Sequence, residues 1–290
     1  MAGFQAVNLS GYLQFRLHSI LRFPHKYPTA SNHPEEFHND QDAIDVFQEL
    51  TRQYPKSQLA AFALFRMAEC YHHGYGPAGE PLLQKGIPQA INIYQNLVQQ
   101  YPNSEVASIS QILTGILYSQ IGKHLEAVDE YNKAFKLFPN ILPSPQFTHL
   151  LPYTSSLGDV GISPIGALAL YLIGEHYEKT GHTKEALEVF AQIVANYLPN
   201  YPNSTIVLTA AYHQIEILWK TQQLKKMVAI SEDLIRDCPK EGVIFFGTWH
   251  EGVTVRICDM EGVPRSLFDA YNKLGMHEKA KQLQEQYPGM

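Results

Sequence analysis

One recurring spacing of residues constrains this chain more than any other feature. A small residue is followed by an aromatic residue four positions later, a second aromatic at eleven and a proline at twelve. Residues four apart lie on one face of an α-helix, and proline cannot continue a helix interior. The pattern therefore predicts a series of helices that each end near a proline. Five segments follow it: Ala43, Phe47, Tyr54 and Pro55; Ala90, Tyr94, Tyr101 and Pro102; Ala127, Tyr131, Phe138 and Pro139; Ala186, Phe190 and Tyr197, with the proline delayed to Pro199; and the degenerate Met227, Ser231, Cys238 and Pro239.

A second pattern predicts a partner helix before the third and fourth of these segments, and it recurs near the C-terminus. Glycine, tyrosine, glycine and alanine recur with gaps of three, four and five residues, and phenylalanine replaces the first glycine in the last copy. The second glycine lies where a turn between helices needs a left-handed residue, so we expect tight turns at Gly122, Gly181 and Gly275. Consecutive helical hairpins follow from this arrangement. The three sets are Gly115, Tyr118, Gly122 and Ala127; Gly174, Tyr177, Gly181 and Ala186; and Phe268, Tyr271, Gly275 and Ala280.

Serine residues after the prolines predict where the next helices begin. Ser57, Ser104 and Ser204 each offer a side-chain oxygen to cap the following helix. Ser163-Pro164 is a further start signal, because proline at the first helical position loses no hydrogen bond.

These signals give a helix map and a division of the chain. We expect an N-terminal helix and loop cap at 1–39, repeats at 40–238 with a long loop at 139–163, and an irregular segment plus a C-terminal hairpin at 239–290. The helices are expected near 9–22, 40–54, 57–73, 86–101, 104–120, 123–138, 164–180, 183–198, 204–220, 223–238, 262–274 and 276–287.

The paired helices and their junctions resemble the tetratricopeptide repeat family, whose unit is about 34 residues. The resemblance implies an all-α fold of antiparallel helix hairpins stacked as a right-handed superhelix. The Tyr-Pro-x-Ser junctions at 54–57, 101–104 and 201–204 are similar to those of bacterial envelope-machinery repeat proteins. The chain lacks the lipobox cysteine of such lipoproteins, so a lipid anchor is not carried over.

Charge and cysteine content exclude several classes of protein. The net charge of −6 has no basic stripe, which argues against nucleic acid as a partner. Three widely spaced cysteines, Cys70, Cys238 and Cys258, do not indicate a disulfide framework or a cysteine-built zinc site. No apolar run approaches the ~18 residues of a membrane span, and the N-terminus does not resemble a signal peptide. We therefore expect a soluble protein without membrane insertion, cytoplasmic or, if a leader was removed, periplasmic.

Helical repeats expose a concave surface on the first helix of each pair, which suits a peptide or partner helix. We therefore expect a non-catalytic scaffold or adaptor that binds a protein or peptide, with no catalytic residues, metal or cofactor. Trp219 is the expected exposed anchor because the neighbouring Lys220 is a poor core residue. The predicted groove residues are Phe62, Arg66, Glu69, His72, His73, Ile112, Ile116, Ser119, Tyr171, Glu175, Glu178, Lys179, Tyr212, His213, Glu216, Trp219 and Lys220.

Two alternatives from other classes stay open. A helical-repeat metalloprotein or enzyme would use the i, i+3 pairs Glu69–His72 and His213–Glu216. A structural subunit of a large assembly would make its contacts through the irregular segments 74–85, 139–163 and 240–261. Weaker candidates are a histidine tract at His25, His33 and His38, and a nucleophile set of Cys258, His250 and Asp259.

Overall fold

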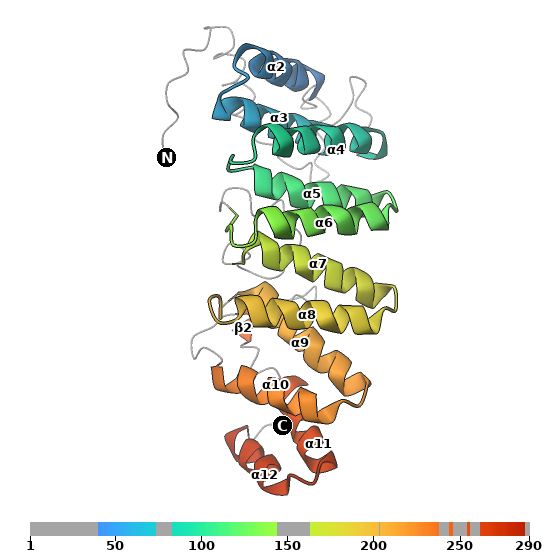
Figure 1. The fold of residues 1–290 in the computed structure, drawn as a ribbon, viewed down its shortest axis with the longest axis vertical. Helices are drawn as coiled ribbons and strands as arrows, with labels where there is room; N and C mark the ends of the chain where they lie inside the picture. The colour runs from blue at the N-terminus through green and yellow to red at the C-terminus, as the bar shows by residue number, and fades with distance from the viewer. Residues whose placement is uncertain are drawn as a thin grey trace, which may run out of the picture. The chain divides into compact units, whose positions relative to one another are not determined.

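The computed structural model describes residues 40–73, 83–143, 163–202, 204–237, 244–245, 254–255 and 262–287. The expected helix at 9–22, the histidine tract, Cys238, Cys258 and His250 lie outside these residues. The described part is all-α apart from a two-residue antiparallel pairing of β1 (Ile244–Phe245) with β2 (Thr254–Val255). The helices are α2 (Asp40–Gln53), α3 (Gln58–His73), α4 (Leu83–Gln100), α5 (Ala107–Gln120), α6 (His124–Leu137), α7 (Ile165–Lys179), α8 (Thr183–Tyr197), α9 (Thr205–Lys220), α10 (Leu224–Asp237), α11 (Gly262–Lys273) and α12 (His277–Gln286) (Figure 1). Each expected helix in the described part is present, and the all-α prediction is confirmed.

The chain divides into two compact units, residues 1–122 and 123–290. In the first unit α3 packs on α2 and on α4, and α5 packs on α4. In the second unit each helix from α6 to α12 packs on its neighbour in sequence. Each hairpin therefore buries its apolar stripe against the next, as in other helical repeats.

The small and aromatic residues of the repeat pattern form the interior of these hairpins. Phe47, Tyr94 and Phe190 are almost fully buried. In the second unit, an added Cβ at Gly174 of α7 would lie 2.6 Å from the Phe190 ring of α8. The ring therefore packs directly on the α7 backbone, which explains why this position of α7 carries a residue without a side chain.

The tight turns between paired helices have the predicted left-handed conformation. Gly122, Gly181 and Gly275 have φ values of +75°, +80° and +72°. The turn between α9 and α10 places Gln222 in the same region, with φ of 57°. This fourth turn carries the conformational strain of a side chain that glycine avoids.

Two of the predicted serine caps are present in the structure. The Ser57 and Ser204 hydroxyls accept hydrogen bonds from Ala60 N and Val207 N, at 3.2 and 3.3 Å. Ser104 does not cap α5, because that helix begins three residues later with Val106 as its N-cap, and the Ser104 hydroxyl is buried without a hydrogen-bond partner.

The start of α7 also differs from the prediction. Pro164 is the N-cap and not the first helical residue. The Ser163 hydroxyl instead makes a buried hydrogen bond of 2.8 Å with the Ser204 hydroxyl. The serine thus links the starts of α7 and α9, an interaction between residues 41 positions apart that local spacing does not reveal.

The second aromatic of the pattern joins one junction to the previous one. In the first unit the Tyr101 hydroxyl donates to the carbonyl of Pro55, at 2.5 Å. In the second unit the Tyr197 hydroxyl donates to the carbonyl of Pro139, at 2.9 Å. Proline ends each helix and leaves its carbonyl free of the helical ladder, so tyrosine can satisfy it.

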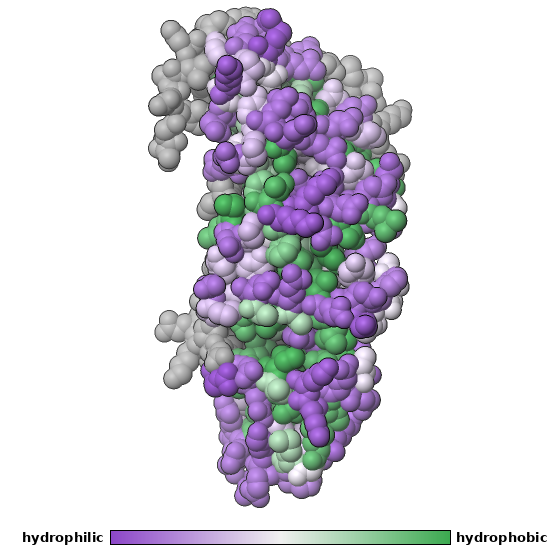
Figure 2. Space-filling model, in the orientation of Figure 1, coloured by the Kyte–Doolittle hydropathy of each residue, from purple (hydrophilic) through white to green (hydrophobic). Residues whose placement is uncertain are grey.

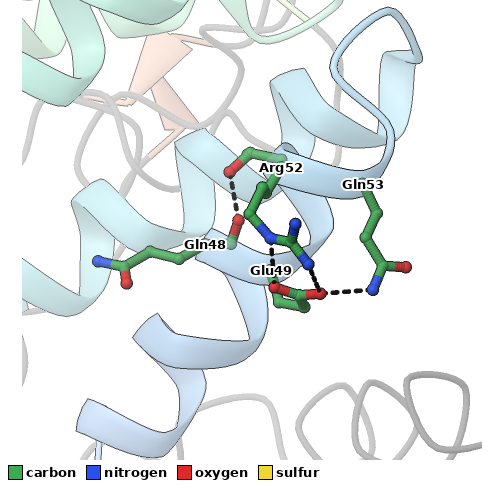
Figure 3. Close-up of polar contacts among 5 residues, drawn as sticks. Gln48, Glu49, Arg52 and Gln53 are labelled. Atoms are coloured by element: carbon green, nitrogen blue, oxygen red, sulfur yellow. Dashed lines mark hydrogen bonds and ion pairs between the residues drawn. The ribbon is translucent and has the colours of Figure 1, made fainter.

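The face shown in Figure 2 is largely covered by hydrophilic residues, with hydrophobic residues between them. On α2, Arg52 binds Glu49 through Nε at 2.8 Å and through a terminal nitrogen at 2.5 Å, and Gln53 donates to the same carboxylate (Figure 3). These hydrogen bonds, first from Arg52 and then from Gln53, lower the pKa of Glu49 to about 2. Such an exposed pair keeps this face of the helix charged without adding much stability.

The turns give a matched pair of substitutions. Gly181→Ala should destabilise the protein by about 1 kcal/mol, because a Cβ is strained at positive φ although nothing lies within 4 Å of it. Gln222→Gly should change stability in the opposite direction, by up to about 1 kcal/mol. Urea denaturation measures both, and equal effects of the same sign would contradict this account of the turns.

The junction tyrosine predicts a pH dependence. Tyr197→Phe should cost about 1 kcal/mol at neutral pH because the Pro139 carbonyl loses its donor. Burial, and to a lesser degree the neighbouring Tyr201, raises the pKa of Tyr197 to about 12. A raised pKa means that its stabilisation is complete below the unfolded value near 10 and is lost as pH rises towards 12. The urea midpoint should therefore fall less between pH 10 and 12 in Tyr197→Phe than in the wild type; identical slopes would contradict the assignment.

Candidate binding face on the first helices of the hairpins

The first helices of three hairpins adjoin one another in the second unit. Besides packing on their hairpin partners, α7 contacts α9 and α9 contacts α11. Their adjoining C-terminal halves carry polar and aromatic side chains that are partly exposed. We call this surface the first-helix face and define it by Glu175, Glu178, Tyr212, His213, Glu216 and Trp219.

The N-terminal halves of α7 and α9 are buried on every side. The first ten residues of α7, Ile165–Gly174, are all buried, as are the first seven of α9, Thr205–Ala211. In the first unit α5 is buried in the same way over Ala107–Gly115. A helix that is apolar all round is an interior helix, and these segments carry no charged residue. Only the C-terminal ends of α7 and α9 are therefore accessible to a partner.

This burial corrects part of the predicted groove. Ile112 and Tyr171 are 0% and 3% exposed, so neither side chain is accessible to a partner. In the first unit Glu69 and His72 are 6% and 8% exposed. Helical spacing indicates the direction of a side chain but not how deeply its helix is buried, which explains the error.

The remaining first-unit predictions lie in varied surroundings. Arg66 forms a 2.7 Å ion pair with Glu69 of the same helix. Burial raises the pKa of Glu69, and the charge of Arg66 opposes this rise. Phe62 and Ile116 are partly buried and Ser119 is exposed, while the side chain of His73 lies outside the described residues. No shared site of these residues emerges from the described contacts.

His213 lies at the centre of the first-helix face and is held by rings on several sides. Its imidazole stacks on Phe190 of α8, with centroids 4.9 Å apart and planes 16° apart. It meets the Tyr171 ring of α7 edge-on, at 5.8 Å. Its Nε2 also makes a 3.2 Å hydrogen bond with the Tyr171 hydroxyl. These contacts fix the plane and direction of the imidazole.

Two glutamates converge on the other side of this imidazole. Oε2 of Glu178, from α7, lies 2.9 Å from His213 Nδ1. Glu216 is one turn further along α9, and one ligand atom from each of Glu178, His213 and Glu216 lies within 4.8 Å of the others. This is the set that can hold a metal ion among the described residues.

The helical spacing of His213 and Glu216 predicts them as a pair but does not indicate their contact with Glu178. The predicted pairs Glu69–His72 and His213–Glu216 lie in different units. The partner that the structure adds comes from a residue 35 positions away, across two helices. A spacing search within one helix cannot find such a contact.

Lysine side chains line the edge of the face. Lys179 lies 3.4 Å from Glu175, and Lys220 lies 3.2 Å from Glu216. Both are i, i+4 pairs with lysines more than half exposed, and such pairs contribute only tenths of a kcal/mol. Both lysine side chains therefore lie at the surface beside the glutamates of the face.

Trp219 is predicted to be an exposed anchor, but in the structure its ring is partly buried. Its ring packs against the hydrophobic cluster that α9, α10, α11 and α12 share. The ammonium of Lys273, at the end of α11, lies 4.1 Å from the ring centroid. The tryptophan thus joins α9 to α11 through a cation–π contact, with one part still at the surface.

Removal of this contact should therefore weaken the fold as well as the face. Trp219→Ala should lower the free energy of unfolding by about 2 kcal/mol, because a half-buried indole leaves the cluster. Lys273→Gln removes only the cation and should cost about 0.5–1 kcal/mol. Thermal denaturation monitored by circular dichroism measures both; an unchanged Tm for Trp219→Ala would show that the indole is not part of the core.

No described helix has the length and apolar character needed to span a bilayer. The comparison with curated proteins gives no match. Among solved structures, BtubC (BKLC) from P. vanneervenii is 12% identical over 87% of this chain and 90% of that chain, with a TM-score of 0.46. A tetratricopeptide repeat protein from Parabacteroides merdae is 13% identical over 96% of this chain and 79% of that chain, with a TM-score of 0.44. MamA from Desulfovibrio magneticus is 13% identical over 84% of this chain and 93% of that chain, with a TM-score of 0.37.

The family comparison rests on the repeats themselves. One tetratricopeptide repeat model matches residues 35–57, 62–104 and 168–197. A second tetratricopeptide repeat model matches residues 112–141. These matches coincide with helices α2 to α8 that the sequence pattern predicts, so the chain carries tetratricopeptide repeats at these residues.

Proposed function

We propose that this chain is a non-catalytic scaffold that binds a peptide or helix of a partner protein on the first-helix face. Tetratricopeptide repeats suggest a protein–protein interaction scaffold. A face built from consecutive first helices is the surface that a helical repeat offers to an elongated ligand.

The single observation that carries the proposal is the mixture of side chains on this face. Tyr212 and Trp219 are partly exposed beside the carboxylates of Glu175, Glu178 and Glu216. Aromatic residues on a rigid helix provide binding area with little loss of conformational entropy, and charged groups around them set orientation. A segment with an apolar side chain between basic residues matches this arrangement.

Burial defines the extent of the proposed binding surface. Because the N-terminal halves of α7 and α9 are buried, the partner contacts a short stretch on each helix and reaches across the hairpins. An extended peptide crossing α7, α9 and α11 fits this geometry better than a helix lying along one of them.

Site-specific photocrosslinking tests the proposal. A benzoylphenylalanine at position 212 replaces one aromatic ring with another on the face, and the same residue at Gln192, exposed on α8, is the matched control. Illumination in the source cells should give a covalent adduct from position 212 and not from 192, identified by mass spectrometry. Equal adducts at both positions would contradict the assignment to this face, and no adduct at either would contradict the scaffold itself.

A further inference from the structure

The hydrogen-bond chain at the first-helix face determines which nitrogen of His213 carries a proton. The Tyr171 hydroxyl has one proton, and a hydrogen bond to Glu175 contributes, after burial and the charges of Glu175 and Glu178, to raising the pKa of Tyr171. A carboxylate only accepts, so the phenol donates to Glu175 and its oxygen accepts from His213 Nε2 at 3.2 Å. Neutral His213 therefore carries its proton on Nε2, and Nδ1 presents a lone pair.

No hydrogen-bond donor satisfies this lone pair on Nδ1. Nδ1 lies 2.9 Å from Glu178 Oε2, but the contact does not have hydrogen-bond geometry, and Nδ1 is buried with no hydrogen-bond partner. Two lone-pair atoms this close repel unless a positive charge lies at or between them. Glu216 adds a further carboxylate oxygen within 4.8 Å.

We propose that Glu178, His213 and Glu216 bind a divalent transition-metal ion of the zinc class and so tie α7 to α9. One imidazole nitrogen and two carboxylate oxygens are a donor set that zinc accepts, with further positions for water or a partner's side chain. The site uses three residues of the first-helix face, but zinc binding does not require that any partner binds there.

The geometry needs little adjustment. Zinc–ligand distances of about 2.0–2.2 Å in a tetrahedral site place two donors about 3.4 Å apart. The present separation of 2.9 Å between Nδ1 and Oε2 thus needs an opening of about half an ångström. The Glu178 and Glu216 side chains are 30% and 37% exposed, so both have room to turn towards an ion and allow it to enter.

Tyr171 is then a positioning residue and not a ligand. A metal-bound histidine usually donates its other ring N–H to a polar group, which fixes the tautomer and the ring direction. Here that group is the buried Tyr171 hydroxyl, and the stack on Phe190 fixes the plane. The surrounding structure therefore holds the imidazole ready for coordination through Nδ1.

The experiment uses the full chain after removal of metal with a chelator, titrated with zinc chloride in a calorimeter. The wild-type protein should bind one zinc ion at this site. The zinc affinity should fall by more than the ~10–100-fold typical of losing an outer-shell partner in each of Glu178→Gln, Glu216→Gln and His213→Gln. Tyr171→Phe should weaken it within that range. Magnesium chloride should not compete, because magnesium prefers an all-oxygen shell.

Two variants control for adventitious zinc on other surface groups. Glu188→Gln removes a glutamate on α8 that lies 3.9 Å from Lys184 and is 66% exposed. His176→Gln removes one member of a second histidine pair, whose ring centroid lies 5.4 Å from that of His124. Both should bind zinc like the wild type.

A second measurement separates metal binding from misfolding. Long-range ¹H–¹⁵N spectra, with the His213 signals assigned from His213→Gln, should show Nε2 protonated in the free protein and a shift of Nδ1 on zinc addition. Unchanged zinc affinity in the three ligand variants, or no zinc binding by the wild type at micromolar concentration, would overturn the proposal.

Discussion

The hairpin of α7 and α8 depends on the close contact between an aromatic ring of one helix and a glycine in the backbone of the other. Phe190 lies against Gly174 so closely that a methyl group would not fit between them. A hairpin made this way is thin and cannot cover its own apolar stripe, so each one needs a neighbour on either side. The buried halves of α7 and α9 are the result, and they restrict the accessible first-helix face to the helix ends.

Much of this architecture was predictable because it is set by local rules. Proline ends a helix wherever it falls, and a turn with positive φ favours glycine, so helix ends and tight turns follow directly from residue type. Ser57 and Ser204 cap helices as expected because these helices begin directly after them. Ser104 does not cap α5 because a short turn intervenes before that helix. Ser163 does not cap α7, and its hydroxyl forms a hydrogen bond with Ser204 at the start of α9.

The candidate site was less predictable, since it depends on contacts between hairpins. Helical spacing places Tyr171 and His213 on the expected side, but the depth of burial depends on how closely the neighbouring helices approach. The uncharged first halves of α5, α7 and α9 are a signal of this burial that the groove prediction did not use. The meeting of Glu178 with His213, from different hairpins, is a property of stacking and has no signature in either helix alone.

The paired hydroxyls of Ser163 and Ser204 have a consequence for how such an array can diverge. Each satisfies the other in a dry environment, and Ser204 also caps α9. Replacement of Ser163 alone leaves the buried Ser204 hydroxyl without this partner, and replacement of Ser204 leaves the Ser163 hydroxyl without it and also removes the cap of α9. The two positions are therefore energetically coupled and should covary among relatives, although 41 residues separate them.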